Sequence, residues 1–389
     1  MRPLKVMLVA SEASADVLGA GLARSLRAKL GPGVVICGVG GAEMAAEGIV
    51  GPFDAAELSL VGFFEIAAAI PRALAHIEAT VRLAEREAPD VAVLIDSWAF
   101  TSRVGQRLRR RTPDLALVKY VAPQVWATRA GRTRAVARTF DHLLTMFAFE
   151  APLFEAEGVP TTFVGSPALN RDTSAADPAR TRAKLGARPD DPILIVLPGS
   201  RPNEIKRLMP PFEEAAMRLK DARPSLRIVL PAADTVAPEV KARAARWRHP
   251  PLVVEGEADK LDAMHAATVA LACSGTVTTE LGVAGCPMVV GYRANGATAM
   301  LARILARVRH LTLINIVAQR EIAPEFLQSA CKGPALAAAV GRLLDDPVQR
   351  AAQIAEQTAA LARLGRGGPD PFDAAAEAVL QVARGRELR

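Results

Sequence analysis

Residues 193–201 read Ile-Leu-Ile-Val-Leu-Pro-Gly-Ser-Arg, and this stretch decides the fold. Its five apolar residues predict a short buried strand, and the Pro-Gly-Ser sequence that follows predicts a tight turn. The same alternation of short apolar runs and longer helical stretches starts at residue 4, fades near residue 170 and starts again here. Because a single core seldom grows beyond about 250–300 residues, this double start in a chain of 389 residues predicts two domains.

The apolar runs outline one sheet in each half of the chain. The candidate strands are residues 4–10, 34–39, 91–95, 115–121, 143–147 and 161–164, then 193–197, 226–230, 252–254, 269–273, 288–290 and 311–316. Helical spacing between strands, as at residues 17–30 and 72–87, indicates parallel sheets with crossover helices. The predicted fold class is α/β, with two doubly wound Rossmann-like domains facing across a cleft, the GT-B arrangement, and with the ligand at the carboxyl ends of the strands.

A polar stretch marks the expected domain boundary. Residues 170–192 contain several Asp and Pro residues and no apolar run, which is typical of a linker. We therefore expect a first domain at residues 1–170, a linker at 171–192 and a second domain at 193–372. Residues 373–389 have the apolar spacing of an amphipathic helix, which we expect to pack back onto the first domain.

Composition narrows the classes of protein and ligand. Half of the residues are apolar and 23% are charged, which excludes a disordered chain, and the net charge of +7 favours anionic partners. Nucleic acid is not expected, because no basic stripe with interleaved aromatics and no nucleic-acid module is present. The four cysteines are scattered without metal-ligand spacing, so neither a disulfide framework nor a metal site is predicted, and no cofactor is expected.

The N-terminus and the apolar runs bear on location. Residues 1–5 lead directly into the first predicted strand, without the apolar stretch and cleavage site of a signal peptide. No segment reaches about 18 uncharged apolar residues, the length of a membrane span. These observations predict a cytoplasmic chain.

Acidic residues follow two strands of the first half. Glu12 and Asp16 lie in the small-residue segment after the first strand, where Asp16 has two interpretations, a helix cap and a catalytic acid. Asp96 follows the strand at residues 91–95, on the edge of the sheet that faces the ligand. It is a candidate general base, and a helix N-cap is the alternative of equal weight.

Candidate phosphate-binding turns follow two strands of the second half. Gly199, Ser200 and Arg201 form a tight turn in which the guanidinium suits a diphosphate. The segment Ser274-Gly275-Thr276 opens a helix whose N-terminus can bind an anion, and capping of this helix by Ser274 can hold at the same time. Glu280 lies one turn into that helix and can accept hydrogen bonds from a ribose.

A third polar group accompanies the last predicted strand. Asn315, Arg320 and Glu321 stand beside the apolar run at residues 311–316. Burying such groups without partners costs free energy, and a ligand in the crevice would explain their presence.

With the segments quoted above taken in their order along the chain, the sequence resembles lipid-A-disaccharide synthase over residues 4–385. The resemblance rests on the joint order of many short motifs, since none is specific alone. Besides the segments quoted above, the matching motifs are residues 38–41, 58–65, 89–96, 120–127, 147–150, 163–165 and 287–290, the pair Tyr292-Arg293, and Gln328.

The resemblance implies an inverting, metal-independent glycosyltransferase. Such an enzyme transfers 2,3-diacylglucosamine from its UDP form to the 6-hydroxyl of 2,3-diacylglucosamine 1-phosphate, giving a β-1,6 disaccharide and UDP. Its partners are therefore a UDP-linked acylated sugar, an acylated sugar phosphate and the inner face of the inner membrane. The oligomeric state stays open, with a homodimer as one option.

The family's roles carry over to matching positions of this chain. Asp96 matches the base or essential acid, with Glu12 and Asp16 in the neighbouring acidic segment. The nucleotide side is expected to comprise Gly199, Ser200, Arg201, Ser274, Gly275, Thr276, Glu280, Tyr292, Arg293, Asn315, Arg320 and Glu321.

Several positions depart from the family pattern, mostly on the acceptor side. The second carboxylate expected after Asp96 is missing from residues 97–101, and the other departures are Ser11, Ala15, Ala99, Ser166, Ile314 and Gln319. Two alternatives to the synthase therefore stay open. One is a divergent paralogue that uses another acceptor or epimerises a UDP-sugar, and the other is a non-catalytic UDP-sugar-binding protein.

The apolar segment at residues 58–74 also has two interpretations. In the family, such a region is expected to meet the membrane or hold acyl chains, whereas an ordinary buried helix is the alternative. The adjacent Phe63 and Phe64 can hardly both face one core, and nearby basic residues favour a peripheral site on an anionic leaflet.

Overall fold

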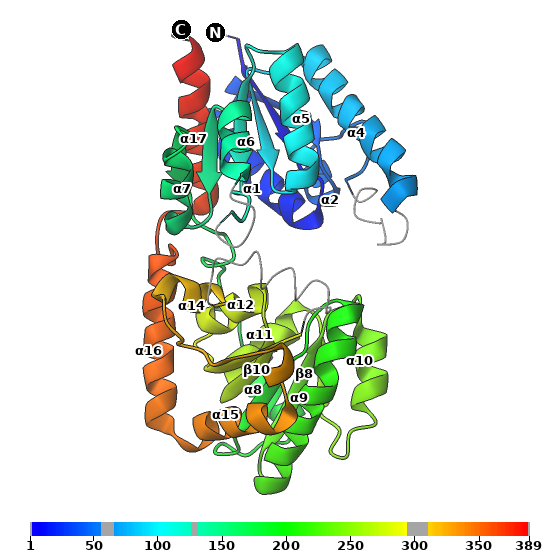
Figure 1. The fold of residues 1–389 in the computed structure, drawn as a ribbon, viewed down its shortest axis with the longest axis vertical. Coiled ribbons are helices and arrows are strands. Elements are labelled where there is room, and N and C mark those ends of the chain that lie inside the picture. The colour runs from blue at the N-terminus through cyan, green and yellow to red at the C-terminus, as the bar shows by residue number, and fades with distance from the viewer. Residues whose placement is uncertain (1, 56–65, 126–130, 294–309, 388–389) are drawn as a thin grey trace. The chain divides into compact units, whose positions relative to one another are not determined.

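The computed structural model describes residues 2–55, 66–125, 131–293 and 310–387, and the chain divides into two compact units (Figure 1). Unit 1 comprises Met1–Pro167 and Gly367–Arg389, and unit 2 comprises Ala168–Arg366. The chain thus passes from one unit to the other twice, and its C-terminal segment belongs to the same unit as its N-terminus.

Within the described residues, six parallel strands form the sheet of unit 1, in the order β2-β1-β3-β4-β5-β6. They are β1 (Leu4–Val9), β2 (Val34–Val39), β3 (Val91–Ile95), β4 (Ala116–Tyr120), β5 (His142–Thr145) and β6 (Thr161–Phe163). Each begins and ends within two residues of the run predicted from sequence. Strands buried on both faces read as continuous apolar runs, which is why the sequence pattern located them well.

Helices cover both faces of this sheet. They are α1 (Ala13–Leu30), α2 (Ala42–Ala46), α4 (Ile66–Glu87), α5 (Trp98–Arg111), α6 (Arg132–Thr139), α7 (Ala151–Glu155) and α17 (Pro371–Glu387). Buried side chains of α1 and α17 share one apolar cluster with Leu8 and Val93. Those of α4 and α5 share another with Val9 and Leu94, because successive strand residues point to opposite faces.

The C-terminal helix α17 packs on α1 and contacts β3, β4 and β5. The approach to α1 is close at Gly21, where a β-carbon would lie 2.2 Å from the ring of Phe372. Only glycine leaves room for the ring at this point of the helix surface. The contacts place α17 in unit 1 as an integral part of its core.

The described part of unit 2 also contains six parallel strands, in the order β12-β11-β10-β7-β8-β9. They are β7 (Ile193–Leu197), β8 (Arg227–Ala232), β9 (Leu252–Glu255), β10 (Val269–Cys273), β11 (Met288–Tyr292) and β12 (Glu325–Leu327). Relative to β7 as the first strand, this is the 3-2-1-4-5-6 order of a dinucleotide-binding sheet, and unit 1 has the related 2-1-3-4-5 order extended by one strand. The prediction of two doubly wound α/β domains is confirmed.

The prediction of a strand at residues 311–316 is wrong. Leu313–Ala318 form helix α14, and the sixth strand is β12, nine residues farther along than the predicted run ends. The side chain of Thr312 caps this helix by accepting a hydrogen bond from the Asn315 N–H, so the apolar run starts as a helix. Periodicity alone cannot distinguish a six-residue apolar strand from a buried helical segment.

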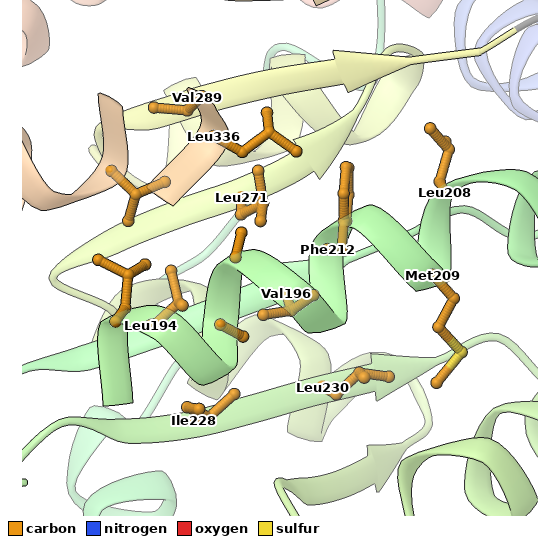
Figure 2. Packing of buried hydrophobic residues seen from close by; sticks show 14 of the residues in the cluster. Leu194, Val196, Leu208, Met209, Phe212, Ile228, Leu230, Leu271, Val289 and Leu336 are labelled. Atoms are coloured by element: carbon orange, nitrogen blue, oxygen red, sulfur yellow. The ribbon is translucent and has the colours of Figure 1, made fainter. Parts of the chain in front are cut away.

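The helices of unit 2 are α8 (Pro178–Lys184), α9 (Pro202–Ala222), α10 (Ala237–Ala244), α11 (Glu257–Ala266), α12 (Thr276–Val283), α14, α15 (Gly333–Asp345) and α16 (Pro347–Arg363). Figure 2 shows α9 packed on the strands, with Phe212 between the helix and the sheet beside Leu271. Leu336 of α15 joins the same cluster. Helices α11 and α12 also contact the strands, and Val277 of α12 packs against the same cluster.

The segment that the sequence suggested as a linker, residues 171–192, contains a helix of its own. Within it, α8 is capped by the side chain of Asp177 and packs on α11. Asp262 of α11 accepts hydrogen bonds from the Asp177 N–H and from Arg180 Nε, each at 2.7 Å. These contacts attach the segment to unit 2.

Candidate functional site

The topology locates a ligand-binding edge in each unit. In a doubly wound sheet the ligand crevice opens outside the carboxyl ends of the strands, where the strand order reverses. That point lies between β1 and β3 in unit 1 and between β7 and β10 in unit 2. The loops after these four strands, together with the first turns of the helices that follow them, contain most of the residues that the sequence indicated.

Glu12 and Asp96 are linked at the strand edge of unit 1. Glu12 is the N-cap residue of α1, and its Oε1 accepts a hydrogen bond of 2.6 Å from Ser97 Oγ. Because Ser97 directly follows Asp96, this bond joins the loop after β1 to the turn after β3. The Asp96 carboxylate is partly exposed and has no hydrogen-bond partner among the described side chains and backbone groups, so it is available to a ligand.

The backbone is strained at this edge. Asp96 and Ser97 have φ of 49° and 39°, and Val121, which follows β4, has φ of 71°. Left-handed conformations are uncommon for residues other than glycine, and a β-branched residue there is an outlier. Ser97, not Asp96, is the N-cap residue of α5, so the helix-cap interpretation of Asp96 is wrong. Strain of this kind concentrates at functional sites.

The Asp16 carboxylate accepts hydrogen bonds from backbone N–H groups. Its Oδ1 accepts hydrogen bonds from the N–H groups of Gly41 (2.8 Å) and Met44 (3.1 Å), and its Oδ2 accepts one from Glu43 (2.8 Å). The buried carboxylate therefore caps α2, a helix remote in sequence, instead of its own helix. Three backbone donors occupy it, which leaves it poorly suited to take a proton from a substrate.

Lys119 is a residue that sequence reasoning missed. It lies on β4, and its amino group is within hydrogen-bond distance of the carbonyl oxygens of Leu94 (3.2 Å), Asp96 (2.5 Å) and Tyr120 (3.3 Å). Burial lowers the pKa of Lys119 to about 7, although the carboxylates of Asp96 and Glu12 oppose the shift. A lysine inside an otherwise apolar strand was the signal in the sequence, because lysine is almost never fully buried without a reason.

In unit 2, the turn after β7 is built around Gly199. This residue has φ of 123°, and a β-carbon on it would lie 2.4 Å from Glu204 Oε2. That oxygen accepts hydrogen bonds from the N–H groups of Ser200 (3.0 Å) and Arg201 (3.3 Å), while Oε1 contacts Arg201 Nη1 at 3.3 Å. The guanidinium is 81% exposed, so Glu204 orients it while leaving most of its donors free for an anion.

The loop after β10 leads into the N-terminus of α12. Gly275 is the N-cap residue, not Ser274 as the capping interpretation had it, and Thr278 Oγ1 donates to the Gly275 carbonyl at 2.8 Å. The first N–H groups of a helix have no partner within the helix, so the exposed turn at Thr276 offers them to an anion. Glu280 lies one turn farther and forms an ion pair of 3.1 Å with Lys260 of α11.

A basic cavity of about 590 Å³ lies beside the same edge of unit 2. It is lined by Asn203, Lys206, Arg207, Pro210, Arg293, Gln328 and Ser329. The α9 residues in this set recur at helical spacing, and they face residues that follow β11 and β12. No carboxylate in the described ranges forms an ion pair with the three cations, so the cavity has the charge of an anion site. Arg293 Nη2 also donates to the Cys331 carbonyl, and Tyr292 ends β11 just before it.

Asn315 is fully used by the fold. Its Nδ2 donates to the Ala323 carbonyl (2.8 Å) and to Glu325 Oε1 (2.9 Å), and its Oδ1 accepts from the N–H groups of Ile322 (2.7 Å) and Ala323 (3.0 Å). Both donors and both acceptor positions of the amide are therefore occupied. In this structure Asn315 stabilises the loop between α14 and β12, which explains the buried polar group without a ligand.

The other two polar residues of this region are also engaged within unit 2. Arg320 is exposed and pairs with Glu356 of α16 at 2.9 Å. Glu321 Oε1 accepts a hydrogen bond of 2.8 Å from the Glu325 N–H. Within the described part of the chain, no hydrogen bond or ion pair links Arg320, Glu321 or Asn315 to the loops after β7 and β10, which adjacent strands bring side by side.

The described residues contain no group of three or more His, Cys, Asp or Glu side chains arranged to hold a metal ion. The cysteines are not reactive groups either. Cys273 and Cys286 are buried, as the sequence indicated, and burial raises the pKa of each thiol to about 12.

Comparison with known proteins gives consistent results. The family model described as lipid-A-disaccharide synthetase matches residues 6–367. The lipid-A-disaccharide synthase of Rhodospirillum centenum is 42% identical over 388 residues, covering 100% of this chain and 97% of the relative. That of Paramagnetospirillum magneticum is 41% identical and covers 99% of both chains. Both of these full-length relatives are named lipid-A-disaccharide synthase. The comparison therefore does not favour the alternatives of a divergent paralogue or a non-catalytic UDP-sugar-binding protein.

Solved structures confirm the fold. The UDP complex of S. aureus MnaA superposes with a TM-score of 0.61 at 15% identity, covering 97% of this chain and 95% of that one. The calicheamicin glycosyltransferase CalG4 gives a TM-score of 0.57 at 18% identity, with 98% and 99% covered. The two units are thus Rossmann-like domains of the GT-B type.

Proposed function

The chain belongs to the lipid-A-disaccharide synthetase family and is a glycosyltransferase, and we propose that it transfers 2,3-diacylglucosamine from its UDP form to the 6-hydroxyl of 2,3-diacylglucosamine 1-phosphate. The products are a β-1,6-linked disaccharide and UDP. The observation that carries the residue assignment is the Asp96 carboxylate, which is partly exposed and has no hydrogen-bond partner among the described residues, at the strand edge where the order of the unit 1 sheet reverses.

In this proposal, Asp96 is the general base. Its carboxylate takes the proton of the acceptor hydroxyl while that oxygen forms a bond to the anomeric carbon of the donor. The bond from the anomeric carbon to the diphosphate breaks, and UDP leaves with the electron pair. Glu12, joined to this turn through Ser97, holds the loop after β1 beside the base.

Unit 2 holds the donor. The turn with the exposed Arg201 and the N-terminus of α12 suit the diphosphate, because both present donors to the charge that develops on the leaving group. The basic cavity with Lys206, Arg207 and Arg293 extends this positive region along the edge of the sheet. Glu280 is available to a ribose hydroxyl once its contact with Lys260 rearranges.

A peripheral site on the inner face of the membrane is the second part of the proposal. No helix within the described ranges is long and apolar enough to cross a membrane. Ile70 and Leu74, in the first turns of α4, are 53% and 44% exposed, with the exposed Arg72 between them. Apolar side chains next to a cation suit an anionic lipid surface, and residues 58–65, which precede this helix, lie outside the described residues.

The direct test supplies both substrates to the purified protein. We expect release of UDP and formation of the disaccharide from the diacylated UDP-sugar and the diacylated sugar phosphate. UDP release without disaccharide would point to another acceptor. Binding of UDP without any turnover would contradict the assignment as an active synthase. Cosedimentation with anionic vesicles, which Ile70→Ser and Leu74→Ser should weaken, tests the membrane site separately.

A further inference from the structure

Lys119 is placed where the strained backbone of unit 1 needs a hydrogen-bond donor. The residue is 1% exposed, and its Cα pairs with that of Leu94, one pair before the carboxyl end of the β3–β4 ladder. From there the side chain reaches toward the carboxyl ends of both strands, where its amino group meets the carbonyl oxygens of Asp96 and Tyr120. The third carbonyl oxygen that the amino group meets is that of Leu94, within β3.

Two of these three carbonyl groups belong to strained peptides. The Asp96 carbonyl precedes Ser97 (φ 39°), and the Tyr120 carbonyl precedes Val121 (φ 71°). Left-handed backbone is disfavoured for such residues because the β-carbon crowds a neighbouring carbonyl oxygen. The Tyr120 carbonyl also accepts the Asp96 N–H at 2.8 Å, so one oxygen joins the Asp96 backbone and the Lys119 amino group. A hydrogen-bond donor at this point offsets the cost of both turns at once.

We propose that Lys119 is a positioning residue, which fixes the left-handed turn at Asp96 and so keeps the catalytic carboxylate in its productive position. This inference rests on the proposed function, because it takes Asp96 as the base. It assigns no proton transfer to Lys119, whose amino group is occupied by three backbone carbonyls. Without these three acceptors, complete burial of the lysine amino group would be unfavourable.

The test compares two lysines of the same sheet. Lys119→Met keeps the length and the apolar part of the side chain but removes the amino group. Lys5→Met is the matched control, because Lys5 Nζ also donates to a backbone carbonyl, that of Glu87 at 2.6 Å, but from the amino end of β1. Both variants are assayed for kcat, for the KM of the UDP-sugar, and for UDP affinity by calorimetry.

For Lys119→Met we expect kcat to fall about 100-fold, the loss expected when a catalytic group moves by about 1 Å, with donor KM and UDP affinity unchanged. Lys5→Met should keep the wild-type kcat. In Lys119→Ala, methylammonium should restore part of kcat, whereas tetramethylammonium, which cannot donate hydrogen bonds, should not. A merely structural lysine would change stability without this selective recovery.

Three results would overturn the inference. They are an unchanged kcat in folded Lys119→Met, an equal loss of kcat in Lys5→Met, and recovery by both ammonium ions. If Lys119→Met fails to fold, Lys119→Gln, which keeps an N–H donor, is compared with Lys119→Ala: Lys119→Gln should retain more of kcat, and an equal loss in the two folded variants would overturn the inference. A wild-type protein that binds UDP but makes no disaccharide would instead remove the proposed function, and this inference with it.

Discussion

At the scale of single residues, the catalytic edge of unit 1 depends on a few side chains with distinct tasks. The Asp96 carboxylate has no hydrogen-bond partner in the part of the chain that the structure describes, Glu12 ties its turn to the neighbouring loop, and Lys119 donates to the Asp96 carbonyl. Asp16 lies close in sequence to Glu12 but caps α2 with its carboxylate. Carboxylates in similar sequence surroundings thus have different tasks, and hydrogen-bond partners distinguish them.

Asp96→Asn tests the base directly. The amide has nearly the same shape but cannot accept the proton of the acceptor, so kcat should fall by about 10²–10⁴-fold. The affinity for UDP, measured by calorimetry, should stay at the wild-type value because the nucleotide is assigned to unit 2. Turnover close to that of the wild type in folded Asp96→Asn would show that another group takes the proton.

The stability of the protein should depend on pH through Lys119. Burial lowers the pKa of this lysine in the folded state to about 7, from an ordinary value of 10.5. Between these values the unfolded chain binds the proton and the folded chain does not, so the stabilisation grows as pH rises and is lost as pH falls through about 7. Urea unfolding at pH 6.5, 8 and 9.5 should show this rise in the wild type and a smaller one in Lys119→Met. If the free energy of unfolding changed with pH by the same amount in both proteins, the lowered pKa of Lys119 would be contradicted.

At the scale of elements, the end of the unit 2 sheet depends on a buried polar cluster. Glu325 of β12 accepts hydrogen bonds from the N–H groups of Leu311 and Thr312, from Thr312 Oγ1 and from Asn315. A carboxylate at the start of α14 satisfies donors that a helix N-terminus leaves open. This arrangement accounts for polar residues that the sequence had assigned to a nucleotide.

Asn315→Ala should therefore act on stability. Removing the amide leaves the N–H groups of Ile322 and Ala323 without their acceptor, at a cost of about 3 kcal/mol or more in the free energy of unfolding. Arg320→Ala, the control, breaks an exposed ion pair with Glu356 and should cost less than about 1 kcal/mol. Denaturant unfolding measures both, and a loss of UDP affinity in folded Asn315→Ala would return this residue to the nucleotide site.

Helix and loop donors, in place of a metal ion, are expected to stabilise the leaving diphosphate. The N-terminus of α12 and the exposed guanidinium of Arg201 carry the positive charge, and no cluster of metal-binding side chains occurs in the described ranges. Turnover should accordingly be the same in EDTA as in added Mg²⁺, within assay error. A rate that falls in EDTA and returns with Mg²⁺ would contradict this assignment.

At the scale of the whole molecule, the proposal divides the function between two units with separate cores. It assigns the base to unit 1 and the nucleotide-binding turns to unit 2, while α17 returns the C-terminus to unit 1. Damage to one core should therefore affect one part of the activity more than the other.

Val379→Asp makes this division testable. Val379 is fully buried in the cluster shared by α17 and α1, and an unpaired carboxylate there should destabilise unit 1 by several kcal/mol. We expect disaccharide formation to be lost while calorimetry still detects UDP binding. Gln381→Asp, at an exposed position of the same helix, should leave both unchanged. Simultaneous loss of both functions in Val379→Asp would indicate that the two units fold as one.

The sequence by itself determined strands β1–β11, the two-domain α/β organisation and the positions of the loops after β1, β3, β7 and β10. It could do so because strands buried on both faces leave continuous apolar runs, and parallel topology brings their carboxyl ends to one edge. Only the tertiary structure decided that residues 313–318 are helical, that Asp16 and Asn315 serve the fold, and that Lys119 lies beneath Asp96. These features depend on contacts between residues that are distant in sequence. Local sequence patterns do not indicate which partner will form the hydrogen bonds of a buried polar group.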